Sequence, residues 1–378
     1  FTDVHMRHIL TQIAGEQGYD WCVTEFIRIT NQLLPAKVFY HYCPELLQAG
    51  KTANGTPVHV QLLGSEPQVL AENAQYVAEL GAPAIDLNFG CPAKSVNRHR
   101  GGAVLLDEPD TIYQIVAAVR HAVPSHIPVS AKMRLGFNDR LRMIDNALAI
   151  ESAGANWLTV HARTKADGYR PPAHWYELAK IRQMVKLPVI ANGDIDSIAS
   201  ALQCQRDSSC TDMMIGRAAV INPQLVRQLK TQAAALSWPE LLQWQLMFLS
   251  DMRHALAHPA FANSGIKWTE SGAVGRYKQW LAMLSQAWPP AKLLFDLVKK
   301  EKVYLNPNYR SYFFNEIDPH GIDTEDTTGL TLRVEGQFLD SFKSKINLNQ
   351  SDVFNWDFEH CRDFLKTGQF YIEQSTDI

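Results

Sequence analysis

The sequence predicts an α/β protein: a TIM (β/α)8 barrel lacking its first strand in this sequence, followed by a small helical domain and an acidic appendage. Two observations predict the barrel. Short β-branched and apolar runs alternate with longer segments of helical periodicity, and this alternation indicates parallel strands joined by right-handed crossovers. Glycine-rich strand ends come late in the chain, whereas a doubly wound sheet, the main rival, carries a glycine-rich phosphate loop after an early strand.

Seven segments have the length and composition of strands. They are Trp21–Phe26, His59–Gly64, Ala84–Gly90, Pro128–Gly136, Trp157–Lys165, Val189–Ile195 and Asp212–Val220. The segments between them repeat apolar residues at helical spacing, which predicts helices at Gln68–Leu80, Asp110–Val123, Leu141–Ala153 and His174–Val185. A barrel has an eighth strand, because only closure of the sheet removes both of its edges.

The chain opens directly with a helix. Thr2 or Asp3 can cap Val4–Ala14, since a short polar side chain accepts a hydrogen bond from the first free amides of a helix. We therefore expect that the complete barrel has one further strand of about ten residues before this helix.

The pattern changes twice after the barrel. We expect a barrel domain over residues 1–236, a helical domain over 237–302 and an appendage of unknown role over 303–378. The appendage carries 6 Lys and Arg against 13 Asp and Glu, while residues 1–302 carry 30 against 26. Its many aromatic residues favour a folded structure. Helices are predicted in the second domain at Glu240–His254, Gly275–Gln286 and Pro290–Lys300.

Composition narrows the class of protein. Hydrophobic residues make up 46% and charged residues 20% of the chain, as in ordinary globular proteins, and no apolar run is long enough to span a bilayer. The six cysteines are scattered without a Cys-x-x-Cys pair, which argues against a zinc site or a disulfide framework. We expect a cytoplasmic monomer that binds neither metal nor membrane.

Residues with chemical potential lie at the predicted strand ends. Cys91 follows the predicted strand Ala84–Gly90, which is the fourth strand of a complete barrel. A single cysteine more often packs in a core than takes part in catalysis, but its neighbours Gly90 and Pro92 favour a shaped loop. Lys132 and Arg134 share one face of the next strand, where two cations are expected to need an anion.

The last two strand ends combine glycine with polar side chains. Asn192-Gly193-Asp194 and Gly216-Arg217 let a ligand approach the backbone closely, beside donors and a cation. Such pairs after the seventh and eighth strands form the phosphate site of many TIM barrels. The order of these motifs therefore predicts a barrel that binds a phosphorylated cofactor.

These motifs together resemble the tRNA-dihydrouridine synthases. The resemblance rests on Asn88-Phe-Gly-Cys-Pro-Ala-Lys94 followed by Gly101-Gly-Ala103, Lys132-Met-Arg-Leu-Gly136, Val160-His-Ala-Arg-Thr-Lys165, Ala191-Asn-Gly-Asp-Ile195 and Met214-Ile-Gly-Arg217, and it covers residues 1 to about 301. Trp21–Arg28, Gln32–Phe39 and Lys278–Leu281 resemble the bacterial subgroup that modifies uridine 16. The family's first strand carries a Pro-Met pair, and this sequence begins just after it. The appendage has no counterpart in the family.

The resemblance assigns roles residue by residue. The positions that match those holding FMN are Gln61, Lys132, His161, Asn192, Gly193, Asp194, Gly216 and Arg217, with His161 also lining the uracil pocket. Asn88 and Arg134 match positions that line the uracil pocket. Arg28, Tyr169, Arg276 and Lys278 match positions that contact tRNA, the last two in the helical domain.

The mechanism that this resemblance implies uses NADPH to reduce FMN, which then delivers hydride to C6 of the uracil. Cys91 matches the catalytic cysteine and gives the proton at C5, because a thiol is mostly protonated at neutral pH. Two alternatives stay open: an FMN barrel that reduces a free pyrimidine, and a tRNA-binding fragment without activity.

Overall fold

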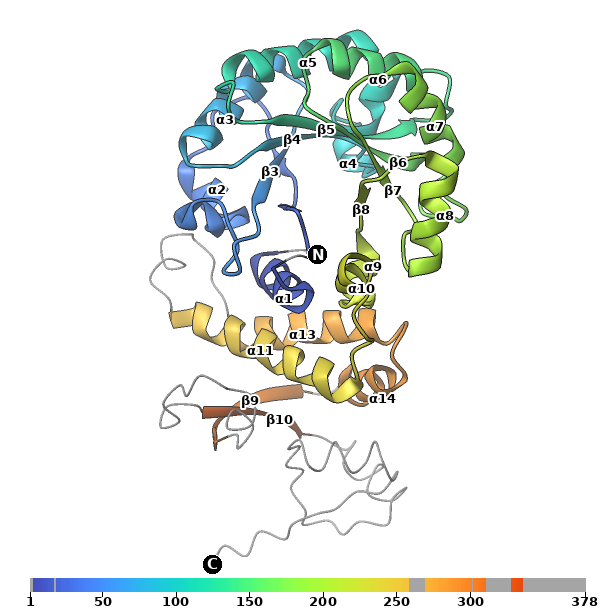
Figure 1. Cartoon of the computed structure of the whole chain (residues 1–378). Helices are drawn as coiled ribbons and strands as arrows, with labels where there is room; N and C mark the ends of the chain where they lie inside the picture. The colour runs from blue at the N-terminus through green and yellow to red at the C-terminus, as the bar shows by residue number, and fades with distance from the viewer. Residues whose placement is uncertain (1–2, 17, 258–268, 301, 311–327, 336–378) are drawn as a thin grey trace, which may run out of the picture. The chain divides into compact units, whose positions relative to one another are not determined.

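The computed structural model describes residues 3–16, 18–257, 269–300, 302–310 and 328–335 (Figure 1). The chain divides into two compact units, one made of residues 1–234 and 259–266 and the other of residues 235–258 and 267–378. The expected appendage beyond Arg310 lies outside the described residues, except for Thr328–Glu335.

The first unit is built on a parallel sheet. Its strands are β1 (Cys22–Val23), β2 (Ile27–Arg28), β3 (Val58–Leu63), β4 (Ile85–Phe89), β5 (Val129–Gly136), β6 (Leu158–Thr164), β7 (Val189–Asn192) and β8 (Met213–Met214). They follow one another as β1-β3-β4-β5-β6-β7-β8, with β2 also paired to β3. Sequential order and parallel pairing throughout are the topology of a (β/α)8 barrel, with β1 and β8 at the two edges of the described sheet. The predicted fold class is confirmed.

Two predicted strands differ from the structure. The segment Trp21–Phe26 is shorter than expected, and β2 continues beside β3 after a break, where Ile27 pairs with Leu62. The prediction Asp212–Val220 was wrong beyond Met214, because Arg217–Ile221 forms helix α9. The run Arg217-Ala-Ala-Val-Ile221 buries Ala219 and Val220, and a run this short cannot be assigned to helix or strand by periodicity alone.

Helices alternate with the strands. They are α1 (Val4–Ala14), α2 (Ala36–Tyr42), α3 (Pro67–Glu79), α4 (Lys94–Asn97), α5 (Pro109–Ala122), α6 (Met143–Ser152), α7 (Trp175–Met184), α8 (Ile198–Ser208), α9 and α10 (Leu225–Thr231), with short 3-10 turns at Pro44–Gln48 and Gly102–Asp107. Helices α3 and α5–α8 lie on the outer side of the strands (Figure 1). The predicted helices of this unit agree with the structure to within two residues at each end, and α1 has the predicted bounds with Asp3 as its cap, accepting from Met6 N at 3.1 Å.

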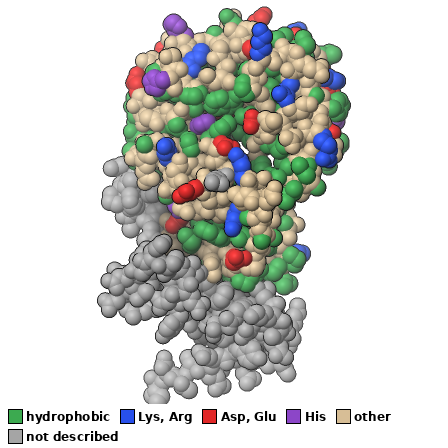
Figure 2. Space-filling model, viewed as in Figure 1, with side chains coloured by type: hydrophobic (Ala, Val, Ile, Leu, Met, Phe, Trp, Pro, Cys, Tyr) green, Lys and Arg blue, Asp and Glu red, His purple; other side chains and the backbone are tan. Residues whose placement is uncertain are grey.

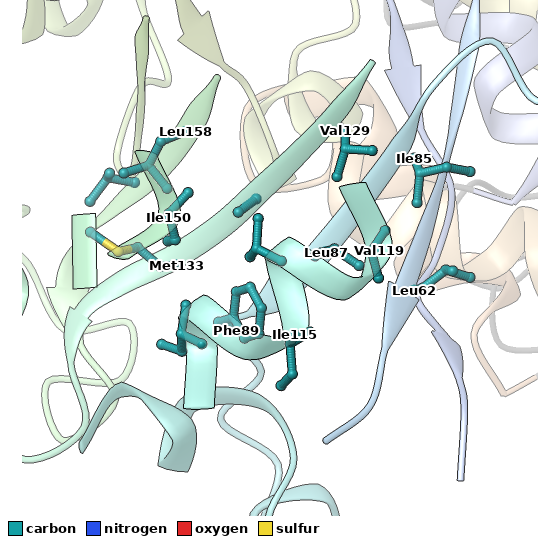
Figure 3. Packing of buried hydrophobic residues seen from close by; sticks show 14 of the residues in the cluster. Leu62, Ile85, Leu87, Phe89, Ile115, Val119, Val129, Met133, Ile150 and Leu158 are labelled. Atoms are coloured by element: carbon teal, nitrogen blue, oxygen red, sulfur yellow. The ribbon is translucent and has the colours of Figure 1, made fainter. Parts of the chain in front are cut away.

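The hydrophobic core fills the layer between these helices and the sheet. Alternate residues of the long strands point outward into it, such as Leu62, Ile85, Leu87 and Phe89, and Ile115 and Val119 of α5 belong to the same core (Figure 3). The other face of each strand consequently points into the barrel. That inner face holds the buried polar side chains of the strands, which sets up the site described below.

Helix α1 is attached to the barrel by a buried ion pair. The Arg7 guanidinium donates to both carboxylate oxygens of Glu45 at 2.8 Å, and both side chains are almost fully buried. Burial lowers the pKa of Arg7, but the neighbouring Glu45 carboxylate more than offsets this, so the guanidinium stays charged. Helix α10 is tied to the residues before β1 by Lys230, which pairs with Asp20 at 2.7 Å.

The second unit contains helices α11 (Trp238–Ala257), α13 (Glu270–Leu284) and α14 (Pro289–Val298), and the antiparallel strands β9 (Lys302–Arg310) and β10 (Thr328–Glu335). Phe248 and Trp280 pack edge to face, with ring centroids 4.9 Å apart. The buried Tyr277 hydroxyl donates to Gln245 Oε1 at 3.1 Å. This unit therefore has an aromatic core of its own.

Charged side chains of both signs are spread over the face of the molecule seen in Figure 2. On the face seen in Figure 2, Lys and Arg are interspersed with Asp and Glu instead of gathering in a single patch. This distribution agrees with the small net charge of residues 1–302 in the sequence. No helix in the described part of the chain is long and apolar enough to cross a membrane.

Candidate active site

The sheet register brings most of the predicted site residues side by side. Asn88 of β4 pairs with Lys132 of β5, and Arg134 of β5 pairs with His161 of β6. His161 in turn pairs with Asn192 of β7. Because parallel strands keep their carboxyl ends together, residues more than 100 apart in the sequence line one continuous inner surface.

Cys91 lies on the loop after β4, where the sequence places it. Its side chain is 7% exposed and packs with Phe26, Leu63 and Val96. Its carbonyl accepts from Asn97 Nδ2 and from Ala103 N, each at 3.0 Å.

A glycine allows the tight turn around Cys91. Gly102 has φ +68°, and a Cβ added there would lie 2.8 Å from the Cys91 carbonyl oxygen and 2.9 Å from Cys91 Cβ. Any other residue at this position would push against the backbone of the cysteine loop. The second glycine of Gly101-Gly-Ala103 is therefore needed for steric reasons.

Lys132 and His161 form the electrostatic centre of the inner surface. Burial, followed by the nearby Arg134, lowers the pKa of Lys132 to about 8, against a raising effect of Asp86. Burial also lowers the pKa of His161 to about 2, with Lys132, Arg134 and Arg163 adding to the effect. At neutral pH the lysine is accordingly a cation and the histidine is neutral.

Arg134 is held by the protein itself. Its Nε donates to Gly90 O at 2.9 Å, and its Nη1 donates to Thr164 O and Gly168 O at 3.0 Å. The guanidinium also lies 5.2 Å from the centroid of the Tyr169 ring. Backbone carbonyls thus satisfy Arg134, and Asp86 provides a negative charge near Lys132; that the two cations also meet an anion from a ligand stays a prediction.

The loop after β6 is fastened by a second arginine. Buried Arg163 donates through Nη2 to Asp194 and through Nε to Arg170 O at 2.7 Å. Asp194 also accepts from Ala173 N at 3.1 Å. The family resemblance assigned Asp194 to FMN binding. In the structure Asp194 also holds this loop in shape.

The ends of β7 and β8 are shaped by glycine. Gly193 has φ +115°, and a Cβ there would lie 2.9 Å from His161 Cδ2. Asn192 Nδ2 donates to Met214 O at 2.8 Å, which ties the two strands. Gly216 is exposed with open space around its Cα, and Arg217 is exposed in the first turn of α9.

Two buried residues of the inner surface, Asp86 and Ser130, were not among the predicted site residues. Asp86 of β4 accepts from Ser130 Oγ and from Gln61 Nε2, each at 2.6 Å. The Gln61 Oε1 accepts from Asn88 Nδ2 at 2.7 Å. A carboxylate that alternates with apolar residues inside a buried strand, Ile85-Asp-Leu-Asn-Phe89, is the signal that could have identified Asp86, since buried charges are rare.

The residues predicted to contact tRNA lie in both units. Arg28 of β2 is exposed, and Tyr169 is 61% exposed on the loop after β6. Arg276 and Lys278 lie on α13 of the second unit, where both are partly buried and Arg276 Nη1 donates to Gln279 Oε1 at 2.7 Å.

The donor set of the inner surface fits a flavin. Among the described residues, none accepts a hydrogen bond from the partly buried Lys132 ammonium, so this donor is available to an acceptor on a ligand. A flavin ring has carbonyl oxygens and ring nitrogens that can accept it, and the open space at Gly216 beside Arg217 can admit a phosphate. Among the same residues no cluster of three or more His, Cys, Asp and Glu could hold a metal ion.

The fold and the site together define a TIM-barrel enzyme with a cysteine at the mouth of the barrel. The sequence pattern of the family described as dihydrouridine synthase (Dus) matches residues 1–262, and the chain belongs to this family. It is thus an oxidoreductase of the dihydrouridine synthase type, as the resemblance in the sequence implied.

The chain is similar to curated tRNA-dihydrouridine(16) synthases over most of their length. The chain is 47% identical over 296 residues to a tRNA-dihydrouridine(16) synthase from Pseudomonas syringae pv. tomato, covering 78% of this chain and 90% of the relative. It is 46% identical over 293 residues to the enzyme of the same name from Shewanella oneidensis, covering 77% and 87%. For that of Pasteurella multocida the identity is 45% over 298 residues, covering 79% and 91%.

Proposed function

We propose that the chain reduces uridine 16 of tRNA to 5,6-dihydrouridine, with FMN held in the barrel and NADPH as the reductant. The observation that carries this proposal is the inner surface of the barrel, where Lys132 and neutral His161 lie next to the loop of Cys91. The name shared by the relatives supports tRNA as the substrate and position 16 as the site of reduction.

The cofactor contacts follow from the arrangement of donors. Gln61, Lys132 and His161 would hold the flavin ring, and the residues after β7 and β8 would hold its phosphate, namely Asn192, Gly193, Asp194, Gly216 and Arg217. When bound and reduced by NADPH, the flavin would supply the hydride for C6 of the uracil. The Lys132 ammonium would stabilise negative charge beside the ring, because it is a cation on the partly buried inner surface.

Cys91 completes the reduction. Addition of hydride at C6 leaves an electron pair delocalised over C5 and the neighbouring carbonyl, and the Cys91 Sγ–H transfers its proton to C5. The resulting thiolate takes a proton back from solvent. The exposed edge of Cys91 is small, which keeps competing proton donors away from the uracil.

The substrate base enters the barrel mouth as an unstacked nucleotide. Asn88 and Arg134 line the pocket for the uracil edge, in which Arg134 acts by holding the backbone of Gly90 and of the loop at Gly168. Tyr169 offers an exposed aromatic ring near His161, with ring centroids 6.1 Å apart, on which a base can stack. Arg28, Arg276 and Lys278 contact tRNA phosphates.

The visible absorbance spectrum of the purified chain, with and without added FMN, tests the cofactor. We expect a bound flavin spectrum, followed by NADPH-dependent formation of dihydrouridine in a tRNA transcript and not in the same transcript lacking uridine 16. Reduction of free uridine at an equal rate would instead indicate a free-pyrimidine reductase, and a colourless chain that binds no FMN would contradict the proposal.

A further inference from the structure

We propose that Asp86 is a positioning residue of this site: through Gln61 and Asn88 it fixes the place of the Gln61 side chain and the backbone of the Cys91 loop. The inference deepens the proposed function and rests on it. Its basis is a continuous chain of hydrogen bonds that crosses three strands and ends at the residue before Cys91.

The chain has four links. Ser130 Oγ donates to Asp86 Oδ1 at 2.6 Å, and Gln61 Nε2 donates to Asp86 Oδ2 at 2.6 Å. Asn88 Nδ2 donates to Gln61 Oε1 at 2.7 Å, and Gly90 N donates to Asn88 Oδ1 at 2.8 Å. Ser130, Asp86 and Gln61 are all buried.

Chemistry fixes the direction of the chain from its Gly90 end. A backbone N–H can only donate a hydrogen bond, so each amide along the chain must present its oxygen toward Gly90 and its nitrogen toward Asp86. Gln61 must therefore turn its nitrogen to Asp86 and its oxygen to Asn88, and Asn88 must turn its oxygen to Gly90. The two amides cannot flip singly without placing two donors or two acceptors against each other in a buried site.

The far end of the chain holds the cysteine loop. Both backbone groups of Gly90 are hydrogen-bonded, because its N–H donates to Asn88 and its carbonyl accepts from Arg134 Nε at 2.9 Å. Cys91 is the next residue, so its position depends on these two hydrogen bonds. At the near end, the Asp86 carboxylate is also the negative charge that favours the ammonium form of Lys132.

Exchanging the two polar residues tests the chain. In Asn88→Asp, the Gln61 amide lies between two carboxylates and can donate to only one of them, so the chain breaks. In the double variant Asp86→Asn with Asn88→Asp, the amide lies at position 86 and the carboxylate at position 88. Gln61 can then turn over, so that its nitrogen donates to the carboxylate at position 88 and its oxygen accepts from the amide at position 86. That carboxylate still accepts from Gly90 N, and the chain is continuous again with reversed direction.

We expect Asn88→Asp to weaken FMN binding by about tenfold or more, since a buried polar group that loses its hydrogen-bond partner destabilises the site that holds it. The double variant should bind FMN at least about tenfold more tightly than Asn88→Asp and restore its bound-flavin spectrum. Ser130→Ala, which removes a donor to Asp86 but leaves the links to Gly90 intact, should stay within about threefold of the wild type.

Three results would overturn the inference: a double variant no better than Asn88→Asp, effects of Asp86→Asn alone and Asn88→Asp alone that simply multiply in the double variant, or a loss in Ser130→Ala equal to that in Asn88→Asp. Thermal unfolding of the same five proteins without FMN shows the same coupling if the chain exists, even for a variant too weak to load with flavin. Wild-type protein that fails to reduce tRNA while this coupling is present would contradict the proposed function and not the chain.

Discussion

Lys132 is a partly buried cation on the inner surface where the cofactor is proposed to bind. It pairs with Asn88 in the sheet and shares the inner surface with Arg134 and His161, so that cations and a neutral imidazole stand close together. The buried Asp86 carboxylate offsets part of the repulsion. Burial in turn raises the pKa of Asp86, and its hydrogen bonds with Ser130 and Gln61 counteract that rise.

The lowered pKa of Lys132 predicts how the site responds to pH. With a pKa of about 8, the ammonium is present below that pH and is lost as the pH rises through 8, while an unfolded lysine stays charged to its ordinary value of 10.5. FMN affinity should therefore fall above pH 8. Lys132→Met should bind FMN more weakly and lose this pH dependence; flavin titrations from about pH 6 to about pH 9.5 measure both.

The same shift has an opposite effect on the stability of the flavin-free protein. Because the folded chain holds fewer protons than the unfolded chain between pH 8 and 10.5, Lys132 should raise the free energy of unfolding as the pH increases across that window. His161, whose pKa is about 2, should contribute no titration to flavin binding near neutral pH. A dependence on pH identical in Lys132→Met would show that another group titrates.

Cys91→Ala tests the proton donor. The variant should keep the bound-flavin spectrum and tRNA affinity, but dihydrouridine formation should slow by a factor of roughly 100 to 10,000, the usual range for loss of a positioned general acid. Cys204→Ala is the matched control, because Cys204 is also buried but lies on α8, away from the inner surface. A normal rate in Cys91→Ala would exclude the thiol as the donor.

At the scale of elements, the loop after β6 illustrates how strand ends hold a site. Arg134 and Arg163 alternate with outward-facing residues on β5 and β6, and both donate to backbone carbonyls of the loop that carries Tyr169. Asp194 at the end of β7 completes the arrangement from the other side. The loop is therefore fixed by side chains from three neighbouring strand ends.

Removing Asp194 should loosen this loop. Asp194→Ala leaves Arg163, which is 1% exposed, without its carboxylate, and the free energy of unfolding should fall by about 3 kcal/mol as for other broken buried ion pairs. Hydrogen exchange at residues 164–173 should accelerate. The control is Glu108→Gln, which weakens the exposed Arg100–Glu108 pair and should cost less than about 1 kcal/mol; equal losses in chemical denaturation would contradict this account.

At the scale of the whole molecule, two units with separate cores carry the residues proposed to contact tRNA. The barrel presents Arg28 and Tyr169, and the helical unit presents Arg276 and Lys278. We expect tRNA binding to depend on a few placed cations more than on a strong overall field, because residues 1–302 carry 30 Lys and Arg against 26 Asp and Glu.

Salt dependence tests whether α13 contacts the RNA backbone. Changing Arg276 and Lys278 together to Gln should weaken tRNA binding and lower the slope of log affinity against log salt by about 1 to 2, one unit per phosphate contact. Lys292→Gln with Lys299→Gln is the matched control, because both lysines pair with Asp296 on the neighbouring α14. An unchanged slope in the α13 variant would place the tRNA on another surface.

Much of this protein was determined by its sequence alone. The cap at Asp3, the helical periodicities and the alternating strands β3–β7 are local features, and each was predicted to within a few residues because its cause lies within one segment. The strand-end motifs likewise predicted which residues line the inner surface, since parallel strands bring their carboxyl ends together.

Only the tertiary structure decided which groups satisfy one another. Asp86 meets Gln61 and Ser130, which lie 25 and 44 residues away, and Arg134 meets Gly90 at a distance of 44 residues. Such partners depend on the register between strands, which no local pattern specifies, and on the need to pair every polar group that the sheet buries. For the same reason the end of β8 was misjudged: Met214 and Arg217 belong to different elements because of what surrounds them, not because of their own preferences.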